Sequence, residues 1–268
     1  LYVVGFMAWL VLGYALMGPR TPLNMSSSPI KVNDIYFVID VSRSMLADDI
    51  SPNRLEVAKN KLLQFAAMRS TDRIGIILFS EKVFTLLPLT IDPEIVKGVI
   101  QDIRIGYLGS GTNIGDALAL AVARGKESST ENKVIILLTD GVSNVGNLTP
   151  LQAAELAMKE KMKVYAIALG TDDEAKIPMG NGFFGQQYQS IPGGSFDLET
   201  LQKIAKMTHG KAFRANSEKA LQEIFEEIEK LERTEIKVTN QTVFEEHYYP
   251  YLLFSLSILL LIEFYRRF

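Results

Sequence analysis

The sequence predicts an α/β domain whose mostly parallel sheet is covered by helices on both faces. Two observations predict this class. Short apolar runs, typical of buried strands, alternate with longer segments in which apolar residues recur at helical spacing. The apolar runs 35–39 and 134–138 also end in polar segments, where an open α/β sheet places its ligand-binding residues. The 268 residues, 47% of them hydrophobic, suffice for one medium-sized core with segments left over.

The elements of this domain can be placed in order along the chain. The strand at 35–39 precedes a helix, which we expect to begin with Ser51 as its N-cap and Pro52 at the first helical position. A tight turn at 80–82 should join two strands as an antiparallel hairpin. By their apolar patterns, the later elements are strands 74–79 and 83–87, helices 95–103 and 114–122, strand 134–139, helix 151–161, strand 164–169, helix 198–207, strand 211–214 and helix 220–231.

The N-terminal segment, residues 1–19, predicts a membrane helix. It contains no charged residue and, at about 1.5 Å per residue, nearly covers a hydrocarbon core of about 30 Å. A signal peptide is the alternative, but the segment has no basic residues before the apolar run and no clean small-residue cleavage site after it. A Pro- and Ser-rich linker, 20–31, leads into the domain, 32–233.

A second transmembrane helix is predicted over residues 248–265, after an extended connector at 234–247. Tyrosines flank its apolar stretch at both ends, as is typical of membrane interfaces, and Arg266 and Arg267 follow in the tail 266–268. Because basic residues favour the cytoplasmic side, we expect a cytoplasmic tail and a domain on the opposite side of the membrane. A buried core helix is the alternative.

Composition excludes several kinds of function. The formal net charge of −3 provides no basic surface for nucleic acid. The absence of cysteine excludes disulfides, thiolate nucleophiles and cysteine-based zinc sites. The two histidines, His209 and His247, are isolated, which disfavours both a histidine-rich metal site and a Ser-His-Asp triad.

Oxygen-bearing residues gather where predicted strands end and helices begin. Asp40, Ser42 and Ser44 directly follow the first strand. Thr112 lies in a glycine-rich loop that opens a helix, and Asp140 ends another buried strand. Carboxylate and hydroxyl oxygens suit a hard cation such as Mg²⁺. The pattern therefore predicts one cation site assembled from three loops; the alternative is that both acids merely cap strand-to-helix turns.

Together these loops resemble the metal-ion-dependent adhesion site of von Willebrand factor A domains. The resemblance implies a Rossmann-like, three-layer α/β fold with a mostly parallel six-stranded sheet and one antiparallel strand, flanked here by two transmembrane helices. It also implies that Ser42, Ser44 and Thr112 offer hydroxyls to Mg²⁺ or Mn²⁺. By the same resemblance, Asp40 and Asp140 act on the cation directly or through water.

Over nearly its whole length the chain is similar to a narrower group, the Bacteroides-aerotolerance Bat proteins of the A/B type. The motifs that carry this likeness are residues 40–47, 52–55, 72–75, 88–90, 111–116 and 133–141. That group implies a membrane-anchored partner of MoxR-type AAA+ ATPases, in the bacterial inner membrane with its domain facing the periplasm.

The likeness also implies a protein-interaction module, not an enzyme. Its cation would bind an acidic residue of a partner, in a complex that serves envelope stress tolerance or protein assembly. The expected partners are Bat-type sister proteins and the MoxR-type ATPase, in a homo- or hetero-oligomer.

Two other functions stay open on the sequence. A phosphatase with an aspartyl nucleophile could use Asp40, but it would usually carry a second acid two positions on, where this chain has Ser42. A surface adhesin could apply the same cation site to host or matrix proteins.

Four further polar residues have a possible functional role beside a structural one. Asp48 and Asp49 could hold a second metal or simply belong to a polar turn. Asp116 could support the cation site or favour the dipole of its helix. Asn144 is expected to brace its own loop through its backbone.

The segment 175–194 interleaves five glycines with aromatic residues. Such a segment should not hold a shape by itself, because glycine adds backbone entropy that ordering removes. Phe183, Phe184 and Tyr188 supply apolar area of the kind that dominates interfaces. The segment follows strand 164–169 and so leaves the sheet at the edge of the cation loops. We expect it to contact a partner there; a mobile insertion is the alternative.

Overall fold

A computed structural model describes residues 2–25, 32–106, 108–182, 185–191, 196–233 and 241–267. The chain divides into two compact units. One comprises Lys31–Thr234, and the other comprises Leu1–Ile30 together with Glu235–Phe268. We refer to them as the sheet domain and the helical-hairpin unit.

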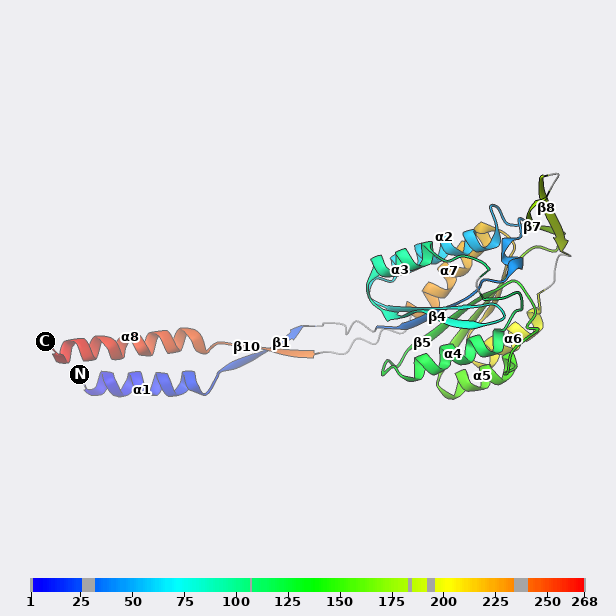
Figure 1. Ribbon diagram of the computed structural model, residues 1–268. Coiled ribbons are helices and arrows are strands. Elements are labelled where there is room, and N and C mark those ends of the chain that lie inside the picture. The colour runs from blue at the N-terminus through cyan, green and yellow to red at the C-terminus, as the bar shows by residue number, and fades with distance from the viewer. Residues whose placement is uncertain are drawn as a thin grey trace. The chain divides into compact units, whose positions relative to one another are not determined.

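The sheet domain is built on a six-stranded sheet in the order β4-β3-β2-β5-β6-β9 (Figure 1). Five strands run parallel, and β4 pairs antiparallel with β3 at one edge, which confirms the predicted hairpin and the mostly parallel sheet. The strands are β2 (Asp34–Asp40), β3 (Arg73–Phe79), β4 (Val83–Thr90), β5 (Lys133–Thr139), β6 (Met162–Leu169) and β9 (Ala212–Ala215).

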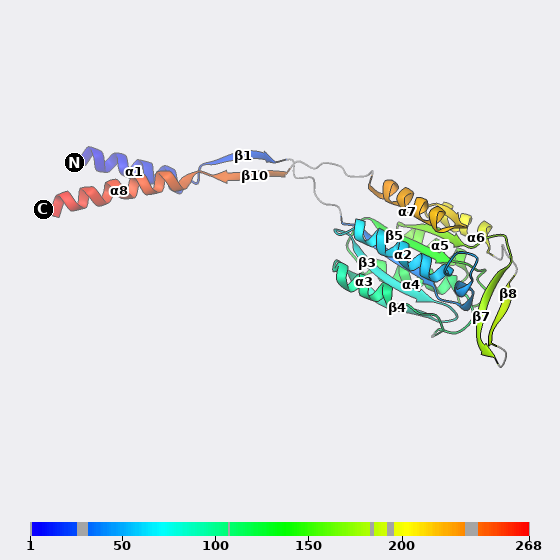
Figure 2. The same ribbon diagram turned by 90° about the horizontal axis from the view of Figure 1, so that it is seen from above.

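Helices cover both faces of the sheet, so the domain has three layers. Helices α2, α3 and α7 lie on one face, and α4, α5 and α6 lie on the other (Figures 1 and 2). Their bounds are α2 (Arg54–Met68), α3 (Pro93–Gln101), α4 (Ile114–Lys126), α5 (Pro150–Lys159), α6 (Leu198–Met207) and α7 (Glu218–Arg233).

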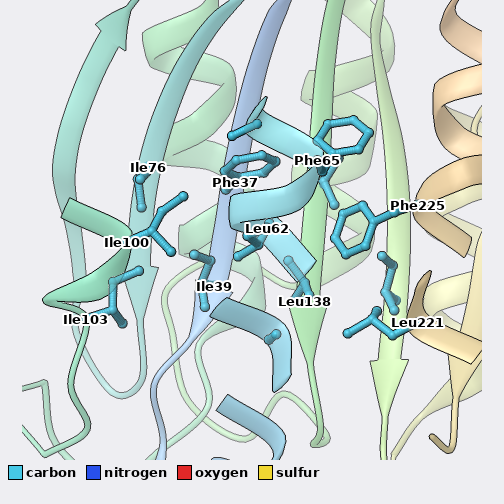
Figure 3. Packing of buried hydrophobic residues seen from close by; sticks show 14 of the residues in the cluster. Phe37, Ile39, Leu62, Phe65, Ile76, Ile100, Ile103, Leu138, Leu221 and Phe225 are labelled. Carbon is cyan, nitrogen blue, oxygen red and sulfur yellow. The ribbon is translucent and has the colours of Figure 1, made fainter. Parts of the chain in front are cut away.

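Strand β2 runs through the centre of the sheet and is buried along its whole length. Because successive side chains alternate between the faces, Phe37 packs under α2 and α7 while Val38 packs under α4. Phe65 of α2 packs against Phe37 and against Phe225 of α7 (Figure 3). Its ring centroid lies 6.0 Å from that of Phe37 and 5.2 Å from that of Phe225. This packing holds the carboxyl end of β2 on a rigid support.

Helix α2 starts two residues later than the expected Pro52. It begins at Arg54, and the side chain of Asn53 caps it by accepting a hydrogen bond from Glu56 N at 2.9 Å. Asn is as good an N-cap as Ser, so the local sequence contained two competing helix starts. The later start places Arg54 in the first turn of the helix.

The helical-hairpin unit contains α1 (Tyr2–Leu16) and α8 (Tyr248–Arg267), which lie side by side (Figures 1 and 2). Their contacts include an edge-to-face pair between Tyr14 and Tyr251 with centroids 5.3 Å apart. Within the described residues, α8 is the one helix long and apolar enough to cross a membrane. Helix α1 is also apolar, but its 15 residues fall short of that length, so a first membrane span stays a prediction.

A two-stranded antiparallel ribbon extends this helix pair. It pairs β1 (Arg20–Met25) with β10 (Gln241–Glu246), so part of the predicted linker and part of the predicted connector are a sheet, not free chain. The ion pair between Arg20 and Glu246, 3.0 Å, lies at the helix end of the ribbon. Sequence analysis missed this pairing because its partners are more than two hundred residues apart along the chain.

Candidate metal centre

The first cation loop begins where β2 ends. The carboxylate of Asp40 is fully buried and accepts hydrogen bonds from Ser42 N, 2.9 Å, and from Thr139 Oγ1 of the neighbouring strand, 2.8 Å. The chain then turns through the short 3₁₀ helix η1 (Arg43–Leu46). As a result, Asp40 is held in place by its own loop and by the end of β5.

The two serines of this loop connect it to the second acid. Ser42 Oγ and Ser44 Oγ lie 2.9 Å apart, and Ser44 Oγ donates to Asp140 Oδ1 at 2.7 Å. Asp140 follows β5, which pairs with β2, so the parallel register brings both strand ends to the same edge of the sheet. Four of the five predicted residues thus form one connected polar cluster.

Thr112 completes the set from the loop that precedes α4. A Cβ placed on Gly141 would lie 3.4 Å from Thr112 Oγ1, so the Thr112 hydroxyl is next to the residue that follows Asp140. Two hydrogen bonds fix this position: Thr112 N donates to Asn144 Oδ1 at 2.9 Å, and Asn144 N donates to Thr112 O at 3.0 Å. Asn144 therefore joins two cation loops, whereas we had expected it to brace its own loop.

Sequence analysis missed a buried arginine beside the cluster. The guanidinium of Arg54 is 3% exposed and donates from Nη1 to Asp140 Oδ2 at 2.9 Å. Its other nitrogens form a bidentate pair with Asp49, at 2.8 and 2.7 Å. Gly170, with a φ of +140°, makes room for it, since a Cβ there would lie 2.9 Å from Arg54 Nη2. The motif around Arg54 was noted for family likeness only.

Asp48 and Asp49 are both engaged within the protein. Asp49 accepts from Arg54 and from Thr171 N at 2.8 Å, so its oxygens stabilise a loop junction. Asp48 Oδ1 accepts from Lys176 N at 2.9 Å. Asp116 likewise accepts from the backbone of residues 147 and 148 and holds that loop against α4. These acids have structural roles in the described contacts.

Burial and like charge control the ionisation of the two central acids. Burial, together with the negative charge of Asp140, raises the pKa of Asp40 from 3.8 to about 7. Burial also raises the pKa of Asp140, and the Arg54 guanidinium counteracts this shift. For Asp49, burial is outweighed by the hydrogen bonds from Arg54 and Thr171, which hold its pKa below the usual range.

The donor set fits a hard divalent cation. Arg54 and Asp49 balance each other, so the buried polar cluster carries two negative charges when Asp40 and Asp140 are both ionised. A divalent cation would compensate for those charges and relieve their repulsion. In the described part of the chain, no three His, Cys, Asp or Glu side chains gather around a metal position, so hydroxyl oxygens would have to complete the shell. Serine and threonine provide such oxygens here.

A β-hairpin stands beside this centre. It pairs β7 (Ala175–Gly182) with β8 (Gly185–Ile191), so the glycine-rich segment has regular structure, contrary to our expectation. Asp48 N donates to Lys176 O at 3.3 Å, and Ala175 and Ile177 pack on Ala47, which anchors the hairpin to the first cation loop. The rings predicted to contact a partner include Phe183 and Phe184, which lie outside the described residues.

Two surfaces flank the cation loops. On the hairpin, Tyr188 is 56% exposed and Arg43 Nη2 contacts Met179 Sδ at 3.2 Å. A cavity of about 380 Å³ begins at Val41, which lies between Asp40 and Ser42 in the sequence. The cavity is lined by Val41, Leu78, Phe84, Leu86, Asp102, Ile103, Arg104 and Leu108.

Comparison with known families identifies the domain. The profile of the von Willebrand factor type A domain matches residues 34–227, which include all three cation loops and the whole sheet. The chain belongs to the von Willebrand factor type A family. This result confirms the fold and the family that the loop motifs had indicated.

Relatives of the chain include Bat-type membrane proteins. BatB from Bacteroides thetaiotaomicron is 29% identical, with a TM-score of 0.63 over 75% of this chain and 99% of that one. An aerotolerance-related membrane protein from Bacteroides fragilis is also 29% identical, with a TM-score of 0.61 over 74% and 98% of the two chains. An uncharacterized protein of Borreliella burgdorferi is 29% identical over 95% of this chain and 75% of its own length. The likeness to the Bat proteins is thereby confirmed.

Type A domains bind divalent cations at a site of this kind. One structure of proximal thread matrix protein 1 from the mussel byssus has a zinc-occupied MIDAS motif. It is 23% identical, with a TM-score of 0.58 over 80% of this chain and 48% of that one, so the likeness establishes a shared fold. This likeness therefore does not determine which cation the present domain binds.

Proposed function

We propose that this chain is a membrane-anchored, cation-dependent protein-interaction module. The observation that carries the proposal is the convergence of Asp40, Asp140 and three hydroxyls at one edge of the type A sheet. We assign Mg²⁺ or Mn²⁺ to this centre, because both accept oxygen ligands and retain positions for water or a partner. The metal supplies positive charge for an acidic residue of the partner.

The surroundings of the centre support protein binding. The hairpin and the cavity at Val41 both provide contact surface next to the cation loops. A partner segment with one acidic residue would bind the cation, while its neighbours contact the exposed Tyr188. The likeness to BatB supports Bat-type sister proteins as partners. From the family resemblance of the sequence motifs we propose a MoxR-type ATPase as a further partner, in a complex for envelope stress tolerance or protein assembly.

Catalysis fits this centre less well than binding. Position 42, where such enzymes usually carry a second acid, is serine. A surface adhesin would use the same cation chemistry but bind host or matrix proteins. The identity of the proteins captured by the chain therefore distinguishes the two functions.

Asp40→Ala combined with Ser42→Ala should abolish cation-dependent partner binding. Loss of two coordinating groups should lower Mg²⁺ affinity by more than about 100-fold, beyond the effect of losing an outer contact. We would measure Mg²⁺ and Mn²⁺ binding by calorimetry on the full chain in detergent. Partners would be captured from solubilised membranes with and without EDTA.

The matched control is Asp197→Ala with Ser217→Ala, which removes the same chemical groups at the starts of α6 and α7. That variant should bind cation and partners normally. Equal Mg²⁺ affinity in the Asp40/Ser42 variant and the native chain would refute the proposal that these residues bind the cation. Capture of sister proteins and an ATPase that persists in EDTA would refute cation dependence.

We also propose that the chain lies in the bacterial inner membrane with its domain in the periplasm. The proposal is supported by Arg266 and Arg267, which lie in the last turn of α8, and by Glu245 and Glu246, which lie just before its first turn. Protease added to cells with a permeabilised outer envelope should therefore cleave the domain. If the domain is cleaved only after the inner membrane is ruptured, it lies in the cytoplasm and the proposed orientation is wrong.

A further inference from the structure

A polar cavity lies at the end of the sheet opposite the cation loops. Its volume is about 440 Å³, and its polar lining includes Tyr36, Arg73, Thr85, Arg124 and Glu127. Arg73 is the first residue of β3, and β4 ends beside it, whereas the cation loops follow the last residues of β2 and β5. We propose that this cavity binds a phosphate diester group, from a phospholipid headgroup or from a soluble molecule.

The side chain of Tyr36 reaches the cavity through a slot between two glycines. A Cβ on Gly75 of β3 would lie 3.0 Å from ring carbons Cδ1 and Cε1, and a Cβ on Gly125 of α4 would lie 3.6 Å from Cε2. Tyr36 is 2% exposed, and its hydroxyl has no hydrogen-bond partner among the described residues. Because a tyrosine hydroxyl this well buried usually has a partner, a ligand in the cavity is the natural acceptor.

The phenol keeps its proton at neutral pH and can therefore donate. Burial, followed by the negative charge of Asp34, raises the pKa of Tyr36. An ionised oxygen of a ligand is a stronger acceptor for this hydroxyl than a neutral one. The hydroxyl thus favours an anionic ligand.

Two guanidinium groups line the same cavity and come from different elements. Arg73 binds Asp34 through Nε and Nη2, at 2.7 and 2.9 Å, which leaves Nη1 without a partner in the described part of the chain. Arg124, in the last turn of α4, is held loosely: its Nε is 3.5 Å from Thr85 Oγ1 and its Nη1 is 3.6 Å from Glu127 Oε1. Donors from β2, β3 and α4 therefore surround one space.

The charges of the cavity suit a ligand with one negative charge. Arg73 is neutralised by Asp34, whose side chain is 0% exposed. The side chains of Arg124 and Glu127 are 47% and 70% exposed, so their ion pair is weak and Glu127 can turn into solvent. One positive charge, that of Arg124, then remains for the ligand.

A phosphate diester matches both this charge and the directions of the donors. It carries a single negative charge, and its tetrahedral oxygens can accept from groups on three sides, whereas the two oxygens of a carboxylate lie in one plane. Guanidinium groups recognise phosphate through paired hydrogen bonds. The cavity is larger than a phosphate group, and Pro88 and Leu89 add an apolar wall for the organic part of the ligand.

The carboxyl end of α4 weakens binding of an anion, because its free carbonyls carry partial negative charge. Arg124 and Lys126 lie in that turn and compensate for it. We expect a dissociation constant on the order of 1 mM for a soluble diester. Phospholipid is the favoured source, since α8 is long and apolar enough to cross a membrane and headgroups have a high local concentration there.

The test is calorimetry on the full chain in a maltoside detergent, which contains no phosphate. The probes are sn-glycero-3-phosphoglycerol, a soluble diester; dihexanoyl phosphatidylglycerol, a lipid with the same headgroup; and acetate, a carboxylate with the same charge. Both phosphate probes should bind, and acetate should bind at least about tenfold more weakly, because it lacks the tetrahedral set of oxygens.

Tyr36→Phe removes the hydroxyl alone and keeps the ring in its slot, so this variant should fold like the native chain. Arg124→Gln removes the positive charge that faces the ligand. We expect the affinity for the diester to fall at least about fivefold in the first variant and at least about tenfold in the second. The matched control is Arg214→Gln, which removes a guanidinium paired with Asp172 at the opposite end of the sheet and should bind the diester normally.

Native affinity for the diester in Tyr36→Phe would overturn the inference, and so would acetate binding as tight as that of the diester. Absence of binding by both phosphate probes would overturn it as well. Tighter binding of the lipid than of the soluble diester, with the same losses in the variants, would identify phospholipid as the source, and equal affinities would identify a soluble diester. Mg²⁺ affinity should stay native in both variants, so failure of this inference leaves the proposed function intact.

Discussion

Replacing Arg54 by leucine should lower the free energy of unfolding of the sheet domain by about 3–5 kcal/mol. The guanidinium is paired at once with Asp49 and Asp140, whose side chains are 2% and 0% exposed. Its removal leaves two carboxylates in a site that water barely reaches, and each must either stay charged without a partner or take up a proton. Breaking a buried ion pair from one side costs this much because the remaining charge has no compensation.

The measurement is urea unfolding of the full chain in detergent, followed by far-ultraviolet circular dichroism. Tryptophan fluorescence would not report on the domain, because the single tryptophan, Trp9, lies in α1. The control is Lys211→Ala, which removes an ion pair with Glu227 whose side chains are 52% and 46% exposed. That change should stay within about 1 kcal/mol of the native chain. An equally small effect of Arg54→Leu would show that the loops relax around the missing guanidinium.

The metal-free domain should become less stable as the pH rises from about 4 to about 7, by roughly 2–4 kcal/mol. The cause is Asp40, whose pKa rises from 3.8 in an ordinary environment to about 7, through burial first and the charge of Asp140 second. A folded-state pKa above the unfolded value means that the folded state binds the proton more tightly. The contribution of Asp40 to stability is therefore complete below about pH 4 and is lost as the pH passes about 7.

Asp40→Asn should reduce this dependence, because the amide carries no charge and can still accept from Ser42 N, and it should leave the part that comes from the raised pKa of Asp140. The acids with lowered pKa values, such as Asp49 and Asp116, act in the opposite direction and at lower pH. Thermal unfolding in EDTA across this pH range tests the prediction. Saturating Mg²⁺ should reverse the trend in the native chain, since the cation binds the ionised carboxylate. A native chain whose metal-free stability rises toward pH 7 would contradict the assignment to Asp40.

Sequence patterns were sufficient for the sheet domain because its elements are locally encoded. Strand β2 is a continuous apolar run, as expected for a central parallel strand buried on both faces. The hairpin of β3 and β4 followed from one short turn between two such runs. Element boundaries were less certain, as α2 shows, because Ser51 and Asn53 are both acceptable caps and only the observed hydrogen bond to Glu56 N distinguishes them.

The proximity of the five candidate ligands was also predictable, since each follows a strand or precedes a helix, while their binding of a cation stays a prediction. Parallel strands end at the same edge, so Asp40 and Asp140 had to lie close together once β2 and β5 were neighbours. The bonds that orient these acids were not predictable. Thr139 at the end of β5 bonds Asp40, Arg54 in the first turn of α2 bonds Asp140, and Asn144 bonds the backbone of Thr112. Nothing in the local sequence of these residues indicates which partner each contacts.

By itself, the sequence determined the fold class, the family and the residues that can offer oxygen to a cation. Those features depend on residue type and on short-range periodicity, which the chain displays directly. The tertiary structure decided how β1 pairs with β10 and how the hairpin is anchored at Asp48. It also decided that Arg54 donates its hydrogen bond to Oδ2 of Asp140. Each of these depends on contacts between segments far apart along the chain. Such contacts are selected by the packing of the whole domain, because a buried charge must find a partner wherever the fold brings one within reach.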